Sequence, residues 1–249
     1  MRRRAFIIGA AATMTLPAYA APLNGAVAIS GGRFVADGQE FHLADILAPS
    51  AYVLAGDGEP YFDAAKRGLE RLLANASLNI KNAGPVTRWG ARVVTAKRVG
   101  ETQTLQHQLV AMGAARVAPQ SDNLELIDQL LVAEDEARAA RKGLWALPAY
   151  RIFDADKAGR AVGRFHLIEG KVRRIAKVKG RVYINFGTDY KTDFTASAGS
   201  RLYRKWAEQG FDVASLTDAR LRIRGFVEAI NGPSITLSHR RQIEVLARE

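Results

Sequence analysis

The chain has 249 residues, of which 36 are Lys or Arg and 25 are Asp or Glu, so its formal net charge at pH 7 is +11. It contains no cysteine, which excludes disulfide bonds, thiolate zinc sites and a cysteine nucleophile. The length is sufficient for two small domains that each bury a hydrophobic core.

The first twenty residues have the layout of a secretory signal. The charged start Arg2-Arg3-Arg4 precedes the apolar run 5–16, and Ala18-Tyr19-Ala20 is a typical cleavage site before residue 21. The run Arg3-Arg4-Ala5-Phe6-Ile7 also resembles a twin-arginine signal, so export by either translocase stays open. The apolar run is shorter than the roughly 20 residues that span a bilayer. We therefore expect a mature protein in the periplasm or secreted, without a transmembrane segment.

Hydrophobic periodicity predicts strands interleaved with helices in residues 21–147. The predicted strands are 26–36 and 40–46 around a turn at Asp37-Gly38, followed by 77–81, 91–98 and a short extended piece at 114–118. The predicted helices are 60–75, 104–112 and 123–142, and the last two end at Gly113 and Gly143. The next segment, 148–163, contains Pro148, Gly159 and Gly163 and is predicted to be a linker.

Residues 164–249 are predicted to form a compact basic β domain with one helix. The predicted strands are 170–178, 181–186, 221–230 and 234–238, and the predicted helix is 200–209. Residues 160–249 hold 18 Lys and Arg against 9 Asp and Glu, whereas residues 21–159 hold 15 against 16. This asymmetry favours a polyanionic partner for the second part, such as nucleic acid or an anionic envelope surface. The alternative is a generally basic protein that its charge keeps soluble.

Side-chain alternation along these strands defines a candidate nucleic-acid-binding face. If Val182, Ile184 and Phe186 point into the core, then Arg181, Tyr183 and Asn185 point outward. The same alternation buries Leu221 and Ile223 and exposes the two arginines beside them. The candidate binding residues are Arg173, Arg174, Lys177, Lys179, Arg181, Tyr183, Arg222 and Arg224. Cations beside an aromatic ring suit single-stranded nucleic acid, and the alternative is a charged strand face that protects a sheet edge.

Several segments of residues 26–147 resemble the staphylococcal nuclease (thermonuclease) family. The closing helix has Ala133-Glu134, Ala137-Arg138, Arg141 and Gly143-Leu144-Trp145 in the family's order, after a segment with Leu105, Leu109-Val110, Gly113, Ala115 and Val117. The stretch from Phe41 to Ser50 resembles I-R-L-x-G-I-D-A-P-E, and Thr87-Arg88-Trp89-Gly90-Ala91 takes the place of D-R-Y-G-R. The resemblance implies a mainly β fold with α-helices, in which helices pack on a small OB-type barrel. A looser resemblance of residues 164–246 to OB-like domains attached to exported nucleases implies a second OB-like β-barrel.

The resemblance also implies a calcium-dependent phosphodiesterase site, from which this sequence departs at five positions. The family has two metal-binding aspartates, a glutamate that handles the attacking water and two arginines that hold the phosphate. Here the aspartate positions carry Gly32 and Leu47, the glutamate position Ser50, and the arginine positions His42 and Ala91. Loss of a single transition-state donor costs about 10²–10³ in rate. With all five replaced, we expect a pseudo-enzyme.

Two residues near the lost site keep an active enzyme open as an alternative. Asp45 would share a strand face with Leu47 and so approach a metal ion. Arg92 follows Ala91, but neighbouring side chains on a strand point to opposite faces, so it should miss the site unless a bulge intervenes. Asp37 and Glu40 are the other nearby acids.

Three functions therefore remain. We favour an exported, non-catalytic module that binds nucleic acid or another anionic polymer through residues 164–249. The alternatives are a calcium-dependent nuclease with relocated catalytic residues and an envelope structural or assembly protein. A metal site and cofactors are not expected, apart from calcium in the nuclease alternative. The sequence leaves the oligomeric state open.

Overall fold

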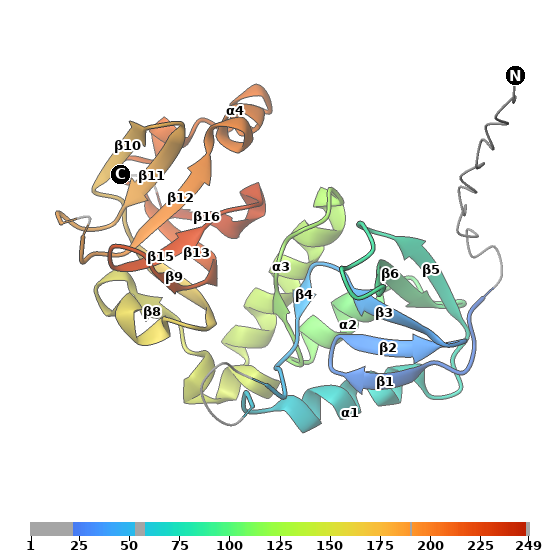
Figure 1. Cartoon of the computed structure of the whole chain (residues 1–249). Helices are drawn as coiled ribbons and strands as arrows, with labels where there is room; N and C mark the ends of the chain where they lie inside the picture. Colours follow the sequence, from blue (N-terminus) through green and yellow to red (C-terminus); the bar gives the residue numbers. More distant parts are fainter. Residues whose placement is uncertain (1–21, 53–57, 190, 248–249) are drawn as a thin grey trace, which may run out of the picture.

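The computed structural model describes residues 22–52, 58–189 and 191–247 (Figure 1). The predicted signal segment 1–20 lies outside these residues. Within them, no helix has the length and apolar character needed to cross a membrane. Strands and packed helices form residues 22–147, here called the N-terminal half, and a mostly β structure forms residues 148–247, the C-terminal half. The predicted combination of β-sheets with packed helices is confirmed.

A five-stranded sheet forms the centre of the N-terminal half. Its strand order is β1 (Val27–Ser30), β2 (Arg33–Ala36), β3 (Gln39–Leu43), β6 (Arg92–Arg98) and β5 (Leu78–Asn82). Asp37 and Gly38 join β2 to β3 with φ of 48° and 73°, the backbone that a tight hairpin requires. Hydrogen bonds between Leu23 and Leu78 connect the segment before β1 to β5. The antiparallel pairing of β2 with β3 confirms the hairpin predicted at Asp37-Gly38.

Three helices pack around this sheet. They are α1 (Phe62–Leu73), α2 (Leu105–Ala111) and α3 (Leu124–Ala139). The side chains of Thr104 and Asn123 accept hydrogen bonds from backbone N–H groups in the first turns of α2 and α3, so polar caps fix where these helices begin. The core between sheet and helices includes the stacked rings of Phe34 and Phe41, whose centroids are 5.1 Å apart.

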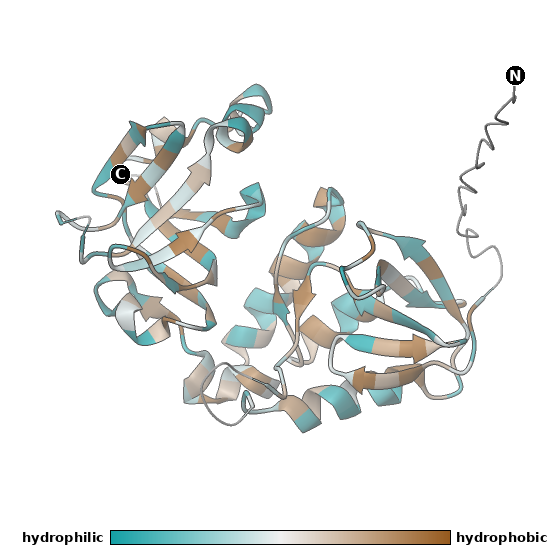
Figure 2. Cartoon of the chain, viewed as in Figure 1, coloured by the Kyte–Doolittle hydropathy of each residue, from teal (hydrophilic) through white to brown (hydrophobic). Residues whose placement is uncertain are grey.

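Two sheets enclose a separate core in the C-terminal half. One has the order β10 (Arg174–Val178), β11 (Arg181–Asn185), β12 (Thr195–Gly199), β15 (Pro233–Thr236) and β14 (Glu228–Ala229). The other has the order β16 (Ile243–Ala247), β13 (Arg220–Phe226), β9 (Phe165–Lys171) and β8 (Phe153–Asp154). Helix α4 (Ser200–Glu208) follows β12. Figure 2 shows hydrophobic and hydrophilic residues alternating along strands of both halves.

Four predicted strands are each divided in the structure. The predicted strand 26–36 forms β1 and β2, and the predicted strand 40–46 forms β3 and the start of β4 (Ile46–Leu47). The predicted strand 170–178 changes sheets at Val172, whose N–H donates to Ala219, so that β9 pairs with β13 while β10 pairs with β11. The predicted strand 221–230 is interrupted at Val227, between β13 and β14. Alternation of apolar residues continues through such bends, so the sequence pattern did not mark them.

The segment predicted as a linker is part of the packed structure. Residues 148–163 contain the 3₁₀ helices η2 (Pro148–Tyr150) and η3 (Ala155–Ala161) on either side of β8. Tyr150, Phe153 and Ala158 are buried, and β8 pairs with β9 in parallel. Pro148 begins η2, Gly159 lies within η3 and Gly163 follows η3, so none of the three marks a connection without structure.

A hydrophobic cluster joins the two halves. Helix α3 lies between the N-terminal sheet and the C-terminal half (Figure 1). The cluster, here called the junction cluster, contains Ala137, Leu144, Trp145, Tyr150, Phe165 and Leu167, with Leu47, Tyr61 and Leu147 packed against it. Arg116 adds a polar contact, because its Nη1 donates to the Phe165 carbonyl oxygen at 2.8 Å. The halves therefore bury side chains against each other.

Candidate functional site

The fold brings together the positions that the resemblance assigns to catalysis. Gly32 lies beside β3 and β4, because its carbonyl accepts from Leu43 N–H and a Cβ added to it would lie 3.7 Å from the Ala48 Cβ. Ala91 immediately precedes β6, which pairs in parallel with the β3 segment that carries His42. The side chains at these positions supply neither carboxylates nor guanidinium groups.

Leu47 has a structural role at the position where the resemblance implies a metal-binding aspartate. It lies in β4 (Ile46–Leu47), which pairs with β7 (Arg116–Val117), and it packs against the junction cluster. A leucine side chain offers no oxygen to a hard cation. Its burial instead contributes hydrophobic stabilisation to the contact between the halves.

Glu40 and His42 are engaged with Arg33 near the same place. Glu40 Oε1 accepts from Arg33 Nε at 2.8 Å and lies 2.7 Å from His42 Nε2. Burial alone would raise the pKa of Glu40, but the hydrogen bonds from His42 and Arg33 outweigh burial and lower it. The resulting cluster is internally paired, so His42 faces a carboxylate that competes with any phosphate.

Asp45 is not on a regular strand, which corrects the prediction that it shares a face with Leu47. It lies in a turn with φ of 62° and is fully buried. Its Oδ1 accepts from the N–H groups of Gln120 and Ser121, both at 2.8 Å, and its Oδ2 accepts from Ser121 Oγ at 2.5 Å. The carboxylate therefore fixes the loop before α3.

The remaining candidate positions do not form a calcium site. Arg92 is buried, and its Nη2 donates to Asn82 Oδ1 on β5 at 2.8 Å. Ser50 is exposed and donates its hydroxyl to the Tyr52 carbonyl oxygen. Among the described residues, no group of three or more His, Asp or Glu side chains could hold a metal ion. These residues do not fit the calcium that the resemblance implies.

The predicted exposure of Arg222 and Arg224 is wrong. Arg224 is completely buried, and its Nη1 donates to Glu134 Oε2 at 2.7 Å and to the Val117 carbonyl oxygen at 3.0 Å. Its Nη2 pairs with Glu244. Burial alone would lower the pKa of Arg224, but Glu134 and Glu244 outweigh burial and raise it.

Arg222 belongs to the same network. Its guanidinium lies 2.8 Å from Glu169, 3.1 Å from Glu244 and 3.3 Å from Asp135. Alternation correctly placed both arginines on the face of β13 opposite its apolar residues, but α3 covers that face. We name Glu134, Glu244, Arg222 and Arg224 the junction ion network.

The β10–β11 hairpin retains part of the predicted binding face. Strand register places Arg174 opposite Asn185, Ala176 opposite Tyr183 and Val178 opposite Arg181. Since paired residues share a face, Arg174, Arg181 and Tyr183 lie together on the outer face, away from the core that contains Val182 and Ile184.

Polar residues continue this outer face across β12. Arg181 Nη2 donates to Ser197 Oγ at 3.0 Å, and Thr195 donates its hydroxyl to Asn185 Oδ1 at 3.2 Å. Asn185 was expected outward and does lie on this face, but it is buried because Thr195 and the Arg174 carbonyl oxygen cover its amide. Thr195, Ser197 and Asn185 are all buried, so the accessible part of this face consists of exposed Arg174 and half-buried Arg181 and Tyr183.

The other cations of the hairpin do not lie on the outer face with Tyr183. Lys177 lies on the opposite side from Tyr183, and Lys179 is in the turn with φ of 46°. Arg173 is exposed before β10.

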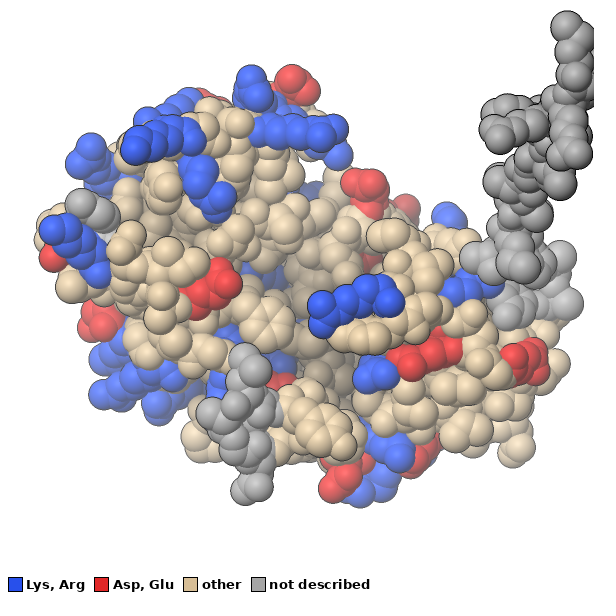
Figure 3. Space-filling view, in the orientation of Figure 1, with Lys and Arg blue, Asp and Glu red and all other residues tan. Residues whose placement is uncertain are grey.

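Helix α4 adds cations that the sequence analysis did not include in the binding face. In Figure 3, Lys and Arg side chains gather over α4 and the β10–β11 hairpin. The signal for α4 was present in the sequence as basic residues at positions 201, 204 and 205, which share a helix face.

Comparison with known proteins identifies one related segment. Residues 40–147 match the family model described as staphylococcal nuclease homologue. The match begins in β3 and ends after η1 (Gly143–Ala146), so it leaves the C-terminal half outside. No curated protein matches the chain.

Proposed function

For a chain that carries a staphylococcal-nuclease-like domain at residues 40–147, we propose a non-catalytic role in holding nucleic acid or another anionic polymer. The polymer binds at the basic end of the C-terminal half. Residues 1–20 direct export, so the protein acts in the periplasm or outside the cell.

The observation that carries the proposal is the position of Leu47. The side chain at the position where the resemblance implies a metal-binding aspartate packs against the junction cluster. A catalytic cation here would need oxygen ligands in an apolar contact, which carries a large desolvation cost. The surface between the halves thus uses the former metal position for packing.

The charge distribution supports binding in the C-terminal half. The junction ion network neutralises Arg222 and Arg224 internally. Among the described residues, no ion pair joins an acidic side chain to Arg174, Lys177, Lys179 or Arg181. These cations remain available to a polyanion, and Tyr183 is a half-exposed ring beside them on which a base can stack.

The nuclease alternative requires a carboxylate that is free to bind a metal ion. Glu40 is held by Arg33 and His42, and Asp45 by Gln120 and Ser121. A relocated site would have to break one of these sets of hydrogen bonds. We therefore place this alternative second.

The test uses the mature protein, residues 21–249, with labelled single- and double-stranded DNA and RNA, in calcium or in chelator. We expect binding whose log affinity falls with log salt concentration, without cleavage in calcium. Cleavage that chelator abolishes would overturn the proposal, and its loss in Asp45→Ala would identify a relocated site. Absence of binding at low salt would leave the envelope assembly role.

Matched variants localise the binding. Arg174→Gln/Arg181→Gln removes two cations from the outer face and should weaken binding. Lys157→Gln/Arg160→Gln removes two exposed cations from η3 and should leave binding unchanged. Equal effects of the two double variants would indicate that net charge alone, and not the hairpin, attracts the polymer.

A further inference from the structure

Helix α4 has a basic outer face and an apolar inner face. Arg201, Arg204 and Lys205 are exposed, and their spacing places them on one side of the helix. Trp206 is buried in the core of the C-terminal half, and Leu202 packs against that core. The helix is thus anchored by its apolar residues and presents cations to solvent.

The turn of the β10–β11 hairpin lies directly beside the start of α4. Ser200 N–H donates to the Gly180 carbonyl oxygen at 2.7 Å, which connects the first residue of α4 to the hairpin turn. Lys177 Nζ lies 5.6 Å from the centre of the Tyr203 ring, a distance at which a cation is attracted to the ring face. We name Lys177, Lys179, Arg201, Arg204 and Lys205 the α4 ridge.

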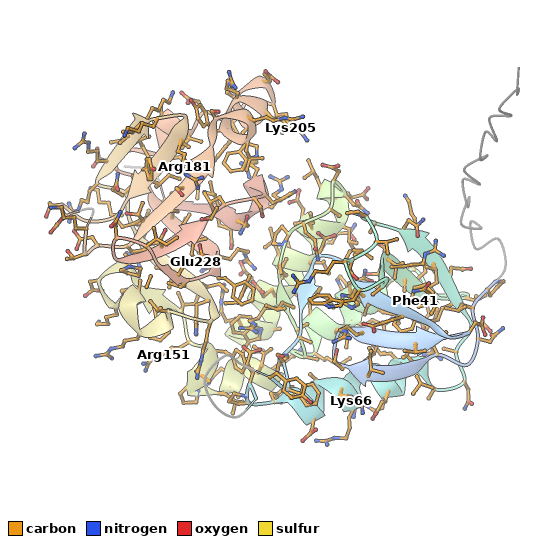
Figure 4. All side chains as sticks on the ribbon, viewed as in Figure 1. Phe41, Lys66, Arg151, Arg181, Lys205 and Glu228 are labelled. Carbon is orange, nitrogen blue, oxygen red and sulfur yellow. The ribbon has the colours of Figure 1, made fainter. Side chains whose placement is uncertain are left out.

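Few acids neutralise the α4 ridge. Lys205 Nζ lies 3.8 Å from Asp122 Oδ1, but the Asp122 side chain is 99% exposed, and such exposed pairs contribute little. Glu208 is the acid on the same face of α4. In Figure 4, Lys205 and Arg181 lie at the same end of the C-terminal half, whereas Arg151 lies at the other end.

We propose that the α4 ridge binds the sugar-phosphate backbone of single-stranded nucleic acid, as an extension of the outer face of β10–β11. This inference rests on the proposed function. Arg181 pairs with Gly199, the residue before α4. The start of α4 is therefore next to Arg181, which places the first ridge cations beside the end of the outer face that carries Tyr183.

The spacing of the ridge cations suits phosphates. From Arg201 to Lys205 the helix rises about 6 Å. Long, flexible arginine and lysine side chains spread over this distance can contact neighbouring phosphates of a single strand. Contacts to phosphates carry no sequence information, so binding through the ridge is independent of sequence.

An anionic lipid surface fits the ridge less well. A helix that lies on a membrane turns an apolar face toward the acyl chains. The apolar residues Leu202, Tyr203 and Trp206 of α4 pack instead on the core of the C-terminal half. The exposed face is left with charge and without an apolar anchor.

The probe is dT20, a labelled single-stranded oligonucleotide of about 20 thymidylates, long enough to cover one binding site. Fluorescence anisotropy measures its binding to the mature wild type and to three variants over a range of salt concentrations. The ridge variant is Arg201→Gln/Arg204→Gln/Lys205→Gln, and the hairpin variant is Arg174→Gln/Arg181→Gln. The control variant, Arg151→Gln/Lys157→Gln/Arg160→Gln, removes three exposed cations at the other end. Thermal unfolding of each form verifies that it is folded.

The ridge variant should bind dT20 about 10–100-fold more weakly at 0.1 M salt, and its salt slope should fall by about 2, because each lost phosphate contact lowers the slope by roughly 0.7. The control variant should match the wild type. If the ridge variant retains the wild-type affinity and slope while the hairpin variant loses binding, the ridge inference fails and the proposed function stands. If the wild type does not bind dT20, the ridge inference fails. If it also binds none of the DNA and RNA probes at low salt, the proposed function fails with it. The wild type could instead bind vesicles that contain an anionic phospholipid more tightly than it binds dT20. If the ridge variant lost that binding, the ligand of the ridge would be a membrane surface and the inference would be wrong.

Discussion

Arg224 offers the sharpest test of the contact between the two halves. Arg224→Met keeps an unbranched apolar stem but removes the guanidinium that pairs with Glu134 and Glu244. The Glu134 side chain is fully buried and the Glu244 side chain is 17% exposed. The substitution thus removes the positive charge that pairs with these two carboxylates. One of them, Glu134, has no access to water that could solvate its charge.

The expected loss is large for a single substitution. Breaking a buried ion pair from one side costs about 3–5 kcal/mol of the free energy of unfolding, because the charge that remains is unpaired. For a chain of this size each kcal/mol lowers the melting temperature by about 2–4 °C, so a decrease of about 6–20 °C follows. Adding Glu134→Gln should recover part of the loss, since the amide does not carry the buried charge.

The assay is chemical and thermal denaturation of the mature wild type, Arg224→Met, Arg224→Met/Glu134→Gln and Arg220→Met. Arg220 is the control, because its side chain is 52% exposed and lies 3.4 Å from Glu169. Exposed pairs of this kind are worth about 0–1 kcal/mol. The reasoning is refuted if Arg224→Met destabilises the protein by no more than Arg220→Met.

Three further outcomes are expected. Burial, followed by the charges of Arg116 and Arg164, lowers the pKa of His166 to about 4, so the unfolded chain takes up the proton first and the free energy of unfolding should fall by about 3 kcal/mol between pH 6.5 and 4. Denaturation across that range should show a flatter profile for His166→Gln, and an unchanged profile would contradict the assignment. Leu47→Asp should lower the melting temperature without producing calcium-dependent cleavage, and cleavage of DNA that chelator abolishes would show that the metal position is still usable. Asp45→Asn should cost about 1.5–3 kcal/mol through its charge-assisted hydrogen bonds while leaving dT20 binding unchanged, which denaturation and anisotropy measure separately.

Local signals in the sequence predicted most of the secondary structure. Thr104 and Asn123 mark the beginnings of α2 and α3 because their side chains satisfy N–H groups that a helix leaves open. Asp37-Gly38 marks the hairpin because these residues tolerate positive φ. Such interactions involve neighbours in the chain, so the residue types alone indicate them.

The candidate site could be predicted only in part. The absence of carboxylates at Gly32 and Leu47 follows from residue identity and needs no structure. The packing of Leu47 against the junction cluster was not predictable, because the cluster includes Phe165 and Leu167 from the other half of the chain. The basic face of α4 was visible as a spacing, but its continuity with the hairpin depends on the contact between Ser200 and Gly180.

The sequence by itself determined which residues alternate on a strand and where the chain lacks the chemistry for metal binding. Only the tertiary structure decided that Arg224 is buried, because alternation assigns a side chain to a face without saying what covers that face. Its partner Glu134 lies 90 residues away. Likewise the carboxylate of Asp45 is taken by a loop 75 and 76 residues further along. The Asp45 contacts form only when the N-terminal half folds, and the Arg224–Glu134 contact forms only when the two halves pack. The packing of the halves therefore separates the buried arginines from the cations that remain at the surface.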